Sequence, residues 1–220
     1  MKILAIEFSS AQKSVAVFRS DWSDENSQEI LETGERSTHA LAMIEEILRQ
    51  SQLEREQVDC LAIGLGPGSY TGIRSAIALA QGWELARPPG SLNLLGISSM
   101  EALAAQAQIE GILGSVALMV DAQRNEFYLA EYEVSSEAFR PTTALSLASF
   151  EEVQQRQTAG AQLAGPGAPK RFPGSRNLFP HAAGVARLAA SRSDFILAEK
   201  LQPIYLRETA FVKAPARPTL

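Results

Sequence analysis

Residues 64–82 read GLGPGSYTGIRSAIALAQG, a glycine-rich turn that leads into a long segment of small and aliphatic residues. Two interpretations of this stretch are open. A glycine turn before a helix binds phosphate through its backbone amides, or it lets another part of the chain pack closely against it. The phosphate motifs are G-x-x-x-x-G-K-[ST] and G-x-G-x-x-G. Gly66, Gly68 and Gly72 fit neither motif, so the stretch favours packing.

The segment after the turn predicts a helix from Ser69 to Ala86, which the sequence Pro88-Pro89-Gly90 ends. Small residues form two lines along this helix: Gly72, Ala76 and Ala80 on one, and Ala78, Gly82 and Ala86 on the other. A glycine inside a helix costs up to about 1 kcal/mol relative to alanine. We therefore expect close contacts with a second helix to offset that cost.

The rest of the chain predicts strands and helices in a repeated order. In the first half we expect three strands up to about Glu35, then a helix at Thr38–Gln50 and a strand before Gly64. After the helix at Ser69–Ala86 we expect a strand at Leu92–Ile97 and a helix at Ser99–Gln108. In the second half we expect two strands around the turn Asp121–Asn125, a strand at Thr142–Leu147, a helix at Ala148–Arg156, a strand at Ala161–Ala164 and a helix at Ala182–Ser191. The recurrence predicts a duplicated α/β fold, with one lobe at residues 1–98 and a second lobe and extended tail (AFVKAPARPTL) at residues 99–220.

The composition is that of an ordinary globular protein. The 220 residues are 45% hydrophobic and 20% charged, which allows a core without metal or disulfide. The single cysteine, Cys60, cannot form an internal disulfide, the N-terminal apolar run is too short for a signal peptide, and no apolar run is long enough to span a membrane. We therefore expect a cytoplasmic protein without membrane contact.

The charge distribution bears on nucleic acid binding. A net charge of −5 argues against a surface that binds nucleic acid throughout. Residues 153–193 contain no Asp or Glu but hold a set of basic residues: Arg156, Lys170, Arg171, Arg176, Arg187 and Arg192. A solvated basic face is the favoured interpretation, and direct contact with nucleic acid through residues 156–192 stays open as the alternative.

The sequence offers few groups for catalysis. The chain has two histidines, far apart in the sequence, so no metal site is predicted, and no serine stands in G-x-S-x-G. One alternative is a site for Mg²⁺ and phosphate that uses Glu7 at the end of the first strand, Ser9 and Asp121. Phe8 stands where a close approach to phosphate needs a small residue, and Asp121 is favoured as the cap of its own turn. No cofactor is therefore predicted.

Several segments of the chain are similar to those of one known family. GPGSYTGIR (66–74), together with MKILAIEFSS (1–10), THALAMIEEIL (38–48), VDAQRNEFYLAEY (120–132) and PIYLRE (203–208), resembles the TsaB (YeaZ) family in the expected order. The resemblance implies a two-lobed fold of the actin, Hsp70 and sugar kinase (ASKHA) type, with duplicated mixed sheets flanked by helices. It also implies a role in forming threonylcarbamoyladenosine beside the anticodon of tRNA. In that family TsaB is a non-catalytic subunit that docks on its catalytic relative TsaD, while TsaE hydrolyses ATP.

The resemblance also bears on catalysis. The catalytic relatives bind a metal with H-x-x-x-H on the first helix, and the corresponding residues here are His39 and Met43, so the second ligand is absent. The prediction is therefore an accessory subunit that is not an enzyme by itself. The alternative is a Mg-ATP-dependent ATPase or phosphotransferase of the same fold, acting through the three residues proposed above for the phosphate site.

The resemblance places the docking surface on the helices at residues 38–50 and 69–86. From helical spacing, the candidate partner-interface residues are Ala40, Met43, Ile47, Arg74 and Ala78. The expected partners are a TsaD-like catalytic subunit and a TsaE-like ATPase. A homodimer through the same helices is a further expectation, and contact with tRNA is expected to be indirect or weak.

Overall fold

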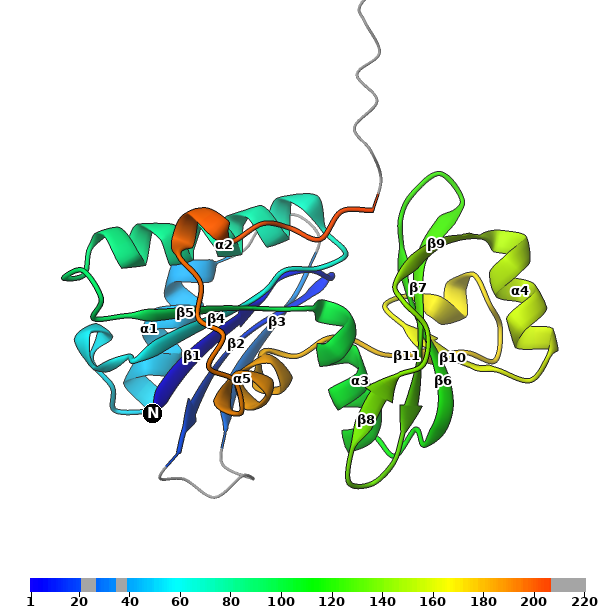
Figure 1. Ribbon diagram of the computed structural model, residues 1–220, viewed down its shortest axis with the longest axis horizontal. Coiled ribbons are helices and arrows are strands. Elements are labelled where there is room, and N and C mark those ends of the chain that lie inside the picture. Colours follow the sequence, from blue (N-terminus) through cyan, green and yellow to red (C-terminus); the bar gives the residue numbers. More distant parts are fainter. Residues whose placement is uncertain (21–26, 35–38, 207–220) are drawn as a thin grey trace, which may run out of the picture.

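The chain folds into two lobes that lie side by side, each built on one mixed β-sheet (Figure 1). The computed structural model describes residues 1–20, 27–34 and 39–206. The predicted tail AFVKAPARPTL therefore lies outside the described residues, as do Glu35 and Thr38 at the ends of two predicted elements. Within the described ranges, no helix is both long and apolar enough to cross a membrane.

Each sheet contains strands from one half of the chain. The first sheet comprises β1 (Lys2–Glu7), β2 (Gln12–Arg19), β3 (Gln28–Thr33), β4 (Cys60–Gly64) and β5 (Asn93–Ile97). The second comprises β6 (Gly114–Asp121), β7 (Glu126–Val134), β8 (Phe139–Pro141), β9 (Ser146–Ser149), β10 (Gln162–Gly165) and β11 (Arg176–Asn177).

The helices lie between and after these strands. The α-helices are α1 (Ala40–Gln50), α2 (Tyr70–Leu85), α3 (Ser99–Ile109), α4 (Phe150–Thr158) and α5 (Ala182–Ala190). Short 3₁₀ turns occur at η2 (Arg55–Gln57), η3 (Ala168–Lys170) and η4 (Ala198–Lys200).

The two sheets share one topology. The strand order is β3-β2-β1-β4-β5 in the first and β11-β10-β6-β7-β8 in the second, with β9 also paired to β7. In each sheet, the first strand in the chain (β1 or β6) pairs antiparallel with the second (β2 or β7). On its other side, β1 pairs parallel with β4 and β4 with β5, and in the same way β6 pairs parallel with β10 and β10 with β11. The predicted α/β fold with duplicated mixed sheets is therefore confirmed. The short strands β8 and β11 were not predicted, because two or three residues are too few to show an alternating pattern.

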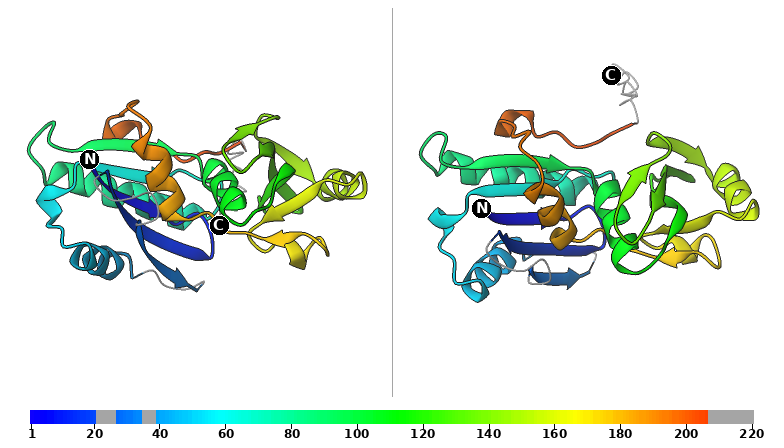
Figure 2. Two further views of the ribbon diagram at one scale, coloured as in Figure 1. Left: turned by 90° about the horizontal axis from the view of Figure 1, so that it is seen from below. Right: turned by 60° about the horizontal axis from the view of Figure 1, so that its bottom comes forward.

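The first sheet is covered on both faces, which explains why its strands are continuous apolar runs. In β1, Leu4 and Ile6 contribute to a core with α1 and α2, whereas Ile3 and Ala5 contribute to a core with α5. Alternate residues of a strand point to opposite faces of the sheet. Helices α1 and α2 therefore lie on one face of the first sheet and α5 on the other, as the two views in Figure 2 show.

The lobes exchange helices. Helix α3 follows the last strand of the first sheet but packs on the second sheet, and α5 follows the last strand of the second sheet but packs on the first. The two helices also contact each other, and Arg192 and Glu101 form an ion pair of 2.7 Å between their ends. The predicted division into residues 1–98 and 99–220 stays a prediction, yet α5 shows that the later part does not pack only with itself.

Candidate functional site

The glycine turn lies at the carboxyl end of the first sheet, between β4 and α2. A Cβ on Gly68 would lie 2.1 Å from the carbonyl oxygen of Ser9, and one on Gly72 would lie 2.0 Å from that of Phe8. The Ser69 amide also donates a hydrogen bond of 2.7 Å to the Ser9 carbonyl. The glycines therefore allow the turn and the start of α2 to lie directly against the end of β1.

This contact changes one prediction for α2. The line Gly72, Ala76 and Ala80 is buried within the chain, so these residues meet the first sheet and not a second helix. The other predicted line is open: Ala78, Gly82 and Ala86 are exposed. A Cβ on Gly82 would meet nothing within 4 Å. The glycine motif thus serves packing inside the lobe, and the outer small residues remain accessible.

Glu7, the proposed phosphate-site residue, is fully buried at the end of β1. Its Oε1 accepts a hydrogen bond of 2.7 Å from the Ser9 amide, and its Oε2 accepts one of 2.7 Å from Ser99 Oγ. Ser99 Oγ in turn accepts from the Gly66 amide at 3.1 Å. Burial raises the pKa of the Glu7 carboxyl, and the hydrogen bonds from Ser9 and Ser99 oppose that rise. Glu7 therefore links β1, the glycine turn and α3.

The other two residues of the alternative phosphate site lie in different surroundings. Ser9 is buried beside Glu7, whereas Asp121 is exposed in the second lobe and its Oδ1 accepts a hydrogen bond of 2.7 Å from the Gln123 amide. Gln123, Arg124 and Asn125 have φ values of 64°, 57° and 63°, which are left-handed conformations that such a cap helps to hold. Asp121 thus caps its turn, which was the favoured interpretation. Both Glu7 oxygens already accept hydrogen bonds from this chain, so Mg²⁺ would have to displace them.

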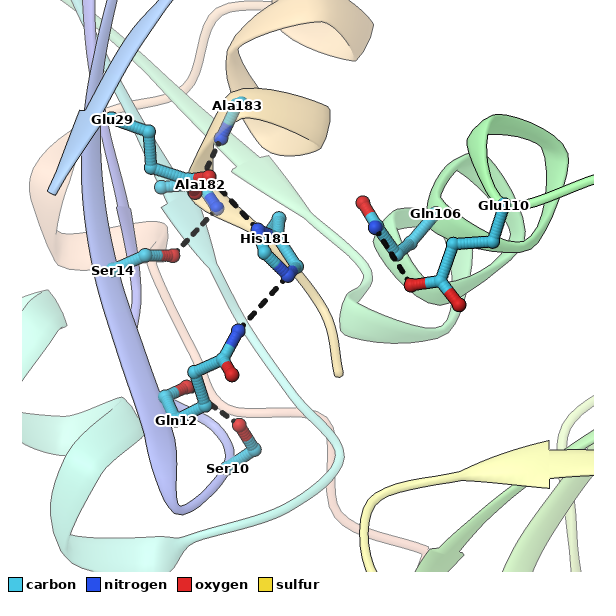
Figure 3. A network of polar contacts seen from close by, with 9 residues as sticks. All are labelled: Ser10, Gln12, Ser14, Glu29, Gln106, Glu110, His181, Ala182 and Ala183. Carbon is cyan, nitrogen blue, oxygen red and sulfur yellow. Dashed lines mark hydrogen bonds and ion pairs between the residues drawn. The ribbon is translucent and has the colours of Figure 1, made fainter. Parts of the chain in front are cut away.

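The two histidines bind different carboxylates. His39 directly precedes α1, and its Nδ1 lies 2.6 Å from Oε1 of Glu32 on β3. His181 precedes α5, and its Nδ1 lies 2.8 Å from Glu29 Oε2 while its Nε2 lies 2.9 Å from Gln12 Nε2 (Figure 3). The structure therefore does not bring the histidines together, and in the part of the chain that it describes no three His, Cys, Asp or Glu side chains are grouped to hold a metal.

The His181 contacts tie α5 to the first sheet. The Ala183 amide donates to Glu29 Oε1 at 3.1 Å, and the Ala182 amide donates to Ser14 Oγ at 2.7 Å, so the first two amides of the helix have partners on the first sheet. Burial alone would lower the pKa of His181, because it disfavours the charged imidazole. The hydrogen bond and the negative charge of Glu29, together with the charges of Glu110 and Glu7, outweigh burial and raise the pKa of His181. In Figure 3 Glu110 lies at the end of α3, across from His181.

Helix α1 presents a different face from the one expected. Met43 and Ile47, two candidate partner residues, are 5% and 0% exposed and belong to the first core, while Ala40 is half-buried at its edge. Leu41, by contrast, is 63% exposed. Met43, Ile44, Ile47 and Leu48 together form one buried face of α1, part of which helical spacing had assigned to a partner. Met43 and Ile47 therefore cannot meet a partner on the surface in this structure.

Helix α2 keeps both of its candidate residues on the surface. Arg74 and Ala78 are exposed, and they line an open groove of about 530 Å³. The opposite wall of the groove comes from Leu201 and Pro203, which lie far along the chain. The Arg74 guanidinium carbon is 5.1 Å from the centre of the Tyr70 ring, close enough for a cation–π contact.

We call residues 196–206 the strap, because this segment follows α5 and crosses the first lobe past β5 and beside α2 (Figure 1, orange to red). Its backbone bonds to the first lobe at both ends: the Ile196 amide donates to the Leu94 carbonyl and the Ile204 amide to the Leu65 carbonyl, each at 2.9 Å. Leu201 is buried in the first core. The strap was not predicted from the sequence, where the only indication was the segment PIYLRE within the family resemblance.

Comparison with known proteins gives a consistent result. A family model described as TsaD, tRNA N6-adenosine threonylcarbamoyltransferase, matches residues 34–199. The tRNA threonylcarbamoyladenosine biosynthesis protein TsaB of Haemophilus influenzae is 32% identical over 197 residues, which is 80% of this chain and 82% of that protein. The TsaB protein of Escherichia coli K12 is 34% identical over 135 residues, covering 60% of this chain and 55% of that protein.

Solved structures agree. YeaZ from Pseudomonas aeruginosa is 27% identical and superimposes with a TM-score of 0.77, covering 93% of this chain and 99% of that one. A second structure, titled as an uncharacterized protein with similarity to peptidase YEAZ from Pseudomonas aeruginosa, is 29% identical with a TM-score of 0.78, covering 94% and 99%. These similarities extend over both lobes and confirm the fold class that the resemblance implied.

Proposed function

This chain belongs to the TsaB (YeaZ) family, and on that premise we propose that it is a non-catalytic subunit that docks on a TsaD-like partner. With a TsaE-like ATPase, the assembly carries out threonylcarbamoylation of tRNA in the cytoplasm. The names of the relatives from Haemophilus influenzae and Escherichia coli support the process. The family model that matches this chain is described as the transferase TsaD. This match supports the choice of partner, because a chain that resembles the catalytic subunit is suited to pair with that subunit.

The observation that carries the docking proposal is the outer surface of α1 and α2. We call the exposed residues Leu41, Tyr70, Arg74, Ala78 and Leu85 the docking face. Its large side chains are well exposed, with Tyr70 at 59% and Leu85 at 86%. Tyr70, Arg74, Ala78 and Leu85 fall on one side of α2 by helical spacing, and exposed apolar side chains on such a face are typical of a protein interaction site. The small Ala78 in the middle lets a partner helix approach closely.

The geometry gives less support to an independent ATPase. Glu7 has no exposed surface and accepts two hydrogen bonds from its own chain. Asp121 holds its own turn in the other lobe. Thermal unfolding with and without Mg-ATP tests this alternative directly, since a ligand at a hundred times its dissociation constant adds about 2.7 kcal/mol of stability. We expect no shift, and a clear rise in Tm would favour the ATPase.

The docking proposal predicts the effect of a charge at the centre of the face. We expect Ala78→Glu to abolish binding to a TsaD-like partner, because an unpaired carboxylate in a closely packed contact costs several kcal/mol, on the order of 3–5. Binding is measured by titration, and function by reconstituting tRNA threonylcarbamoylation from purified components with this chain supplied, withheld or replaced by the variant. We expect product only with the wild-type chain.

The control is Arg187→Glu, which also places a carboxylate at an exposed position and changes the net charge by two units, where Ala78→Glu changes it by one. Arg187 lies on α5, and α5 covers the opposite face of the first sheet from α1 and α2. This variant should bind and support the reaction as the wild type does. If Ala78→Glu supported the reaction at full rate, the docking face would be misplaced. If product formed equally well without the chain, the proposed function would be wrong.

The exposed docking face also leads us to propose that the isolated chain associates through it into a homodimer. An apolar face that a partner covers in the assembly favours self-association when that partner is missing. Light scattering on the isolated protein, with Ala78→Glu as the comparison, tests this. We expect the variant to be monomeric at concentrations where the wild type is dimeric.

A further inference from the structure

His181 lies where the chain passes from the second lobe to the first. It follows Leu178, which belongs to a core of the second lobe, and it directly precedes α5, which packs on the first sheet. The side chain of His181 is 18% exposed, and that of its partner Glu29 on β3 is 16% exposed. Charges that are shielded from water in this way interact more strongly than charges on an open surface. The charge state of His181 therefore bears on how the lobes are joined.

The contacts of His181 accommodate both of its charge states. In Figure 3 the amide nitrogen of Gln12 lies 2.9 Å from His181 Nε2, so Nε2 accepts a hydrogen bond and Nδ1 donates one to Glu29 Oε2 at 2.8 Å. This arrangement is that of the neutral imidazole. A second proton makes Nε2 a donor as well, and the Gln12 amide then presents its oxygen by a half-turn about its last side-chain bond. Protonation thus adds a charge next to Glu29 without breaking the bond to Glu29.

Carboxylates from three elements act on His181: Glu29 on β3, Glu110 at the end of α3 and Glu7 at the end of β1. Of these, Glu29 is in direct contact with the imidazole. Figure 3 shows Glu110 across from His181, with the Gln106 side chain donating to its Oε1 at 3.0 Å. Burial lowers the pKa of His181, and the three carboxylates, Glu29 before the others, outweigh burial and raise it.

The cations on α5 and on the adjacent end of β2 do not oppose these carboxylates. Arg192 is already paired at the far end of α5, and Arg187 is exposed on the outer side of that helix. Lys13 of β2 lies on the same side of the strand as Val15, which belongs to the core that α1 and α2 cover on the other face of the sheet. Negative charge therefore predominates around His181.

We propose that His181, with Glu29 and Glu110, forms a pH-sensitive contact between the two lobes. The protonated imidazole forms an ion pair with Glu29 of the first lobe and attracts Glu110 of α3, the helix that packs on the second sheet. Loss of the proton leaves the hydrogen bond to Glu29 but removes the attraction for Glu110, so the lobes are held together less firmly as pH rises. This inference concerns the isolated chain and does not rest on the proposed function, because α1 and α2 lie on the opposite face of the first sheet.

NMR titration of the full-length chain, labelled at histidine, measures the proton on His181 directly. The chain has two histidines, so the variant His39→Gln assigns both signals. We expect the His181 midpoint to lie at higher pH in the folded chain than in the same chain unfolded in urea, because the carboxylates around it favour the charged form. Equal midpoints in the two states would overturn the inference.

Variants of the two carboxylates test whether the contact joins the lobes. Glu29→Gln should lower the His181 midpoint most. Glu110→Gln should lower it by a smaller amount that shrinks as salt is added, because Glu110 is exposed to solvent. The matched control is Glu151→Gln, also exposed, on α4, which covers the opposite face of the second sheet from α3; it should leave the midpoint unchanged. If Glu110→Gln also left it unchanged, His181 would not sense the second lobe and the inference would be wrong.

The effect on stability is measured by urea unfolding of wild type and His181→Gln between pH 5.5 and pH 8.5. Because the pKa of His181 is raised in the folded state, its contribution to stability is fully present below its ordinary value of 6.5 and is lost as pH rises through the folded-state pKa. We therefore expect the stability of wild type relative to His181→Gln to decrease as pH rises, and to decrease less when both chains also carry Glu110→Gln.

The pH dependence separates this inference from a purely structural role of His181. A stability difference that stayed constant with pH would reduce His181 to a hydrogen-bonding residue at the start of α5, and the inference would be wrong. Thermal unfolding checks that each variant is folded. Should His181→Gln fail to fold, the NMR titrations, which keep His181, decide the question.

Discussion

Glu7 is the residue where burial and charge conflict most strongly. The carboxyl is fully buried, yet its position at the junction of β1, the glycine turn and α3 gives it hydrogen bonds from Ser9 and Ser99. A buried carboxylate is retained only when such donors offset the loss of hydration. The sequence indicated Glu7 only as a candidate for the alternative phosphate site at the end of the first strand, and its bond to Ser99 was hidden because Ser99 lies 92 positions away. The structural role of Glu7 was therefore not predictable from its neighbours in the chain.

This environment predicts a pH effect in Glu7→Gln. Because burial raises the folded-state pKa above its ordinary value of 4.5, the folded protein binds more protons than the unfolded chain just above that pH. The stability contribution of Glu7 is thus fully present below about pH 4.5 and is lost as pH rises through the folded-state pKa. Glutamine does not titrate, so the stability of wild type relative to Glu7→Gln should fall as pH rises.

Urea unfolding of wild type and Glu7→Gln from pH 4.5 to pH 8 measures this difference. The exposed Asp121→Asn serves as the comparison for loss of a carboxylate at a surface turn. A stability difference between wild type and Glu7→Gln that stayed constant over this range would show that Glu7 does not titrate differently in the two states.

At the scale of elements, α1 shows where sequence periodicity stops being informative. Its length and position were predicted closely, because Leu, Ile and Met recur at helical spacing. Its orientation was not, since Met43 and Ile47 were assigned to a partner although they share one face of the helix with Ile44 and Leu48. The sheet takes Met43, Ile44, Ile47 and Leu48, and Leu41 remains outside. The apolar residues of α1 thus turn one common face to the sheet, and no second apolar face is left over for a partner.

This orientation predicts opposite effects for two substitutions on α1. Ile47→Ala removes a fully buried side chain and should lower the free energy of unfolding by about 2–5 kcal/mol. Leu41→Ala removes an exposed one and should change it by no more than about 0.5 kcal/mol. Binding to the partner should respond the other way round, with the larger loss in Leu41→Ala when both variants are folded. Chemical unfolding and titration on the same preparations check both, and equal destabilisation would mean that the helix is rotated.

At the scale of the whole molecule, the exchange of α3 and α5 makes each lobe depend on the other. The repeated order of strands predicted the duplication, and both sheets have the same topology. The exchange itself was not predictable, because the alanine-rich pattern of α5 marks a buried helix without saying which sheet buries it. More than a hundred residues separate α5 from β1, β2 and β4, and more than eighty separate it from β5, which it also covers. Local sequence therefore predicts the longer strands of each lobe but not the helix that completes its core.

The exchange predicts that residues 1–98 do not fold alone, although they contain the whole first sheet. Without α5, one face of that sheet would expose a row of apolar side chains: Ile3, Ala5, Ala16, Phe18, Cys60 and Ala62. Removing a helix from one face of a sheet leaves an apolar surface that favours aggregation over cooperative folding. Far-UV circular dichroism and thermal unfolding of a 1–98 fragment should therefore show no cooperative transition.

A covalent fusion that returns residues 178–206 to this fragment through a flexible linker should restore a cooperative transition. The same fusion with Ala186→Glu, which places a charge in the contact with the sheet, should not restore it. A cooperative transition in the bare fragment would show that α1 and α2 suffice for the first core and that α5 is dispensable to it.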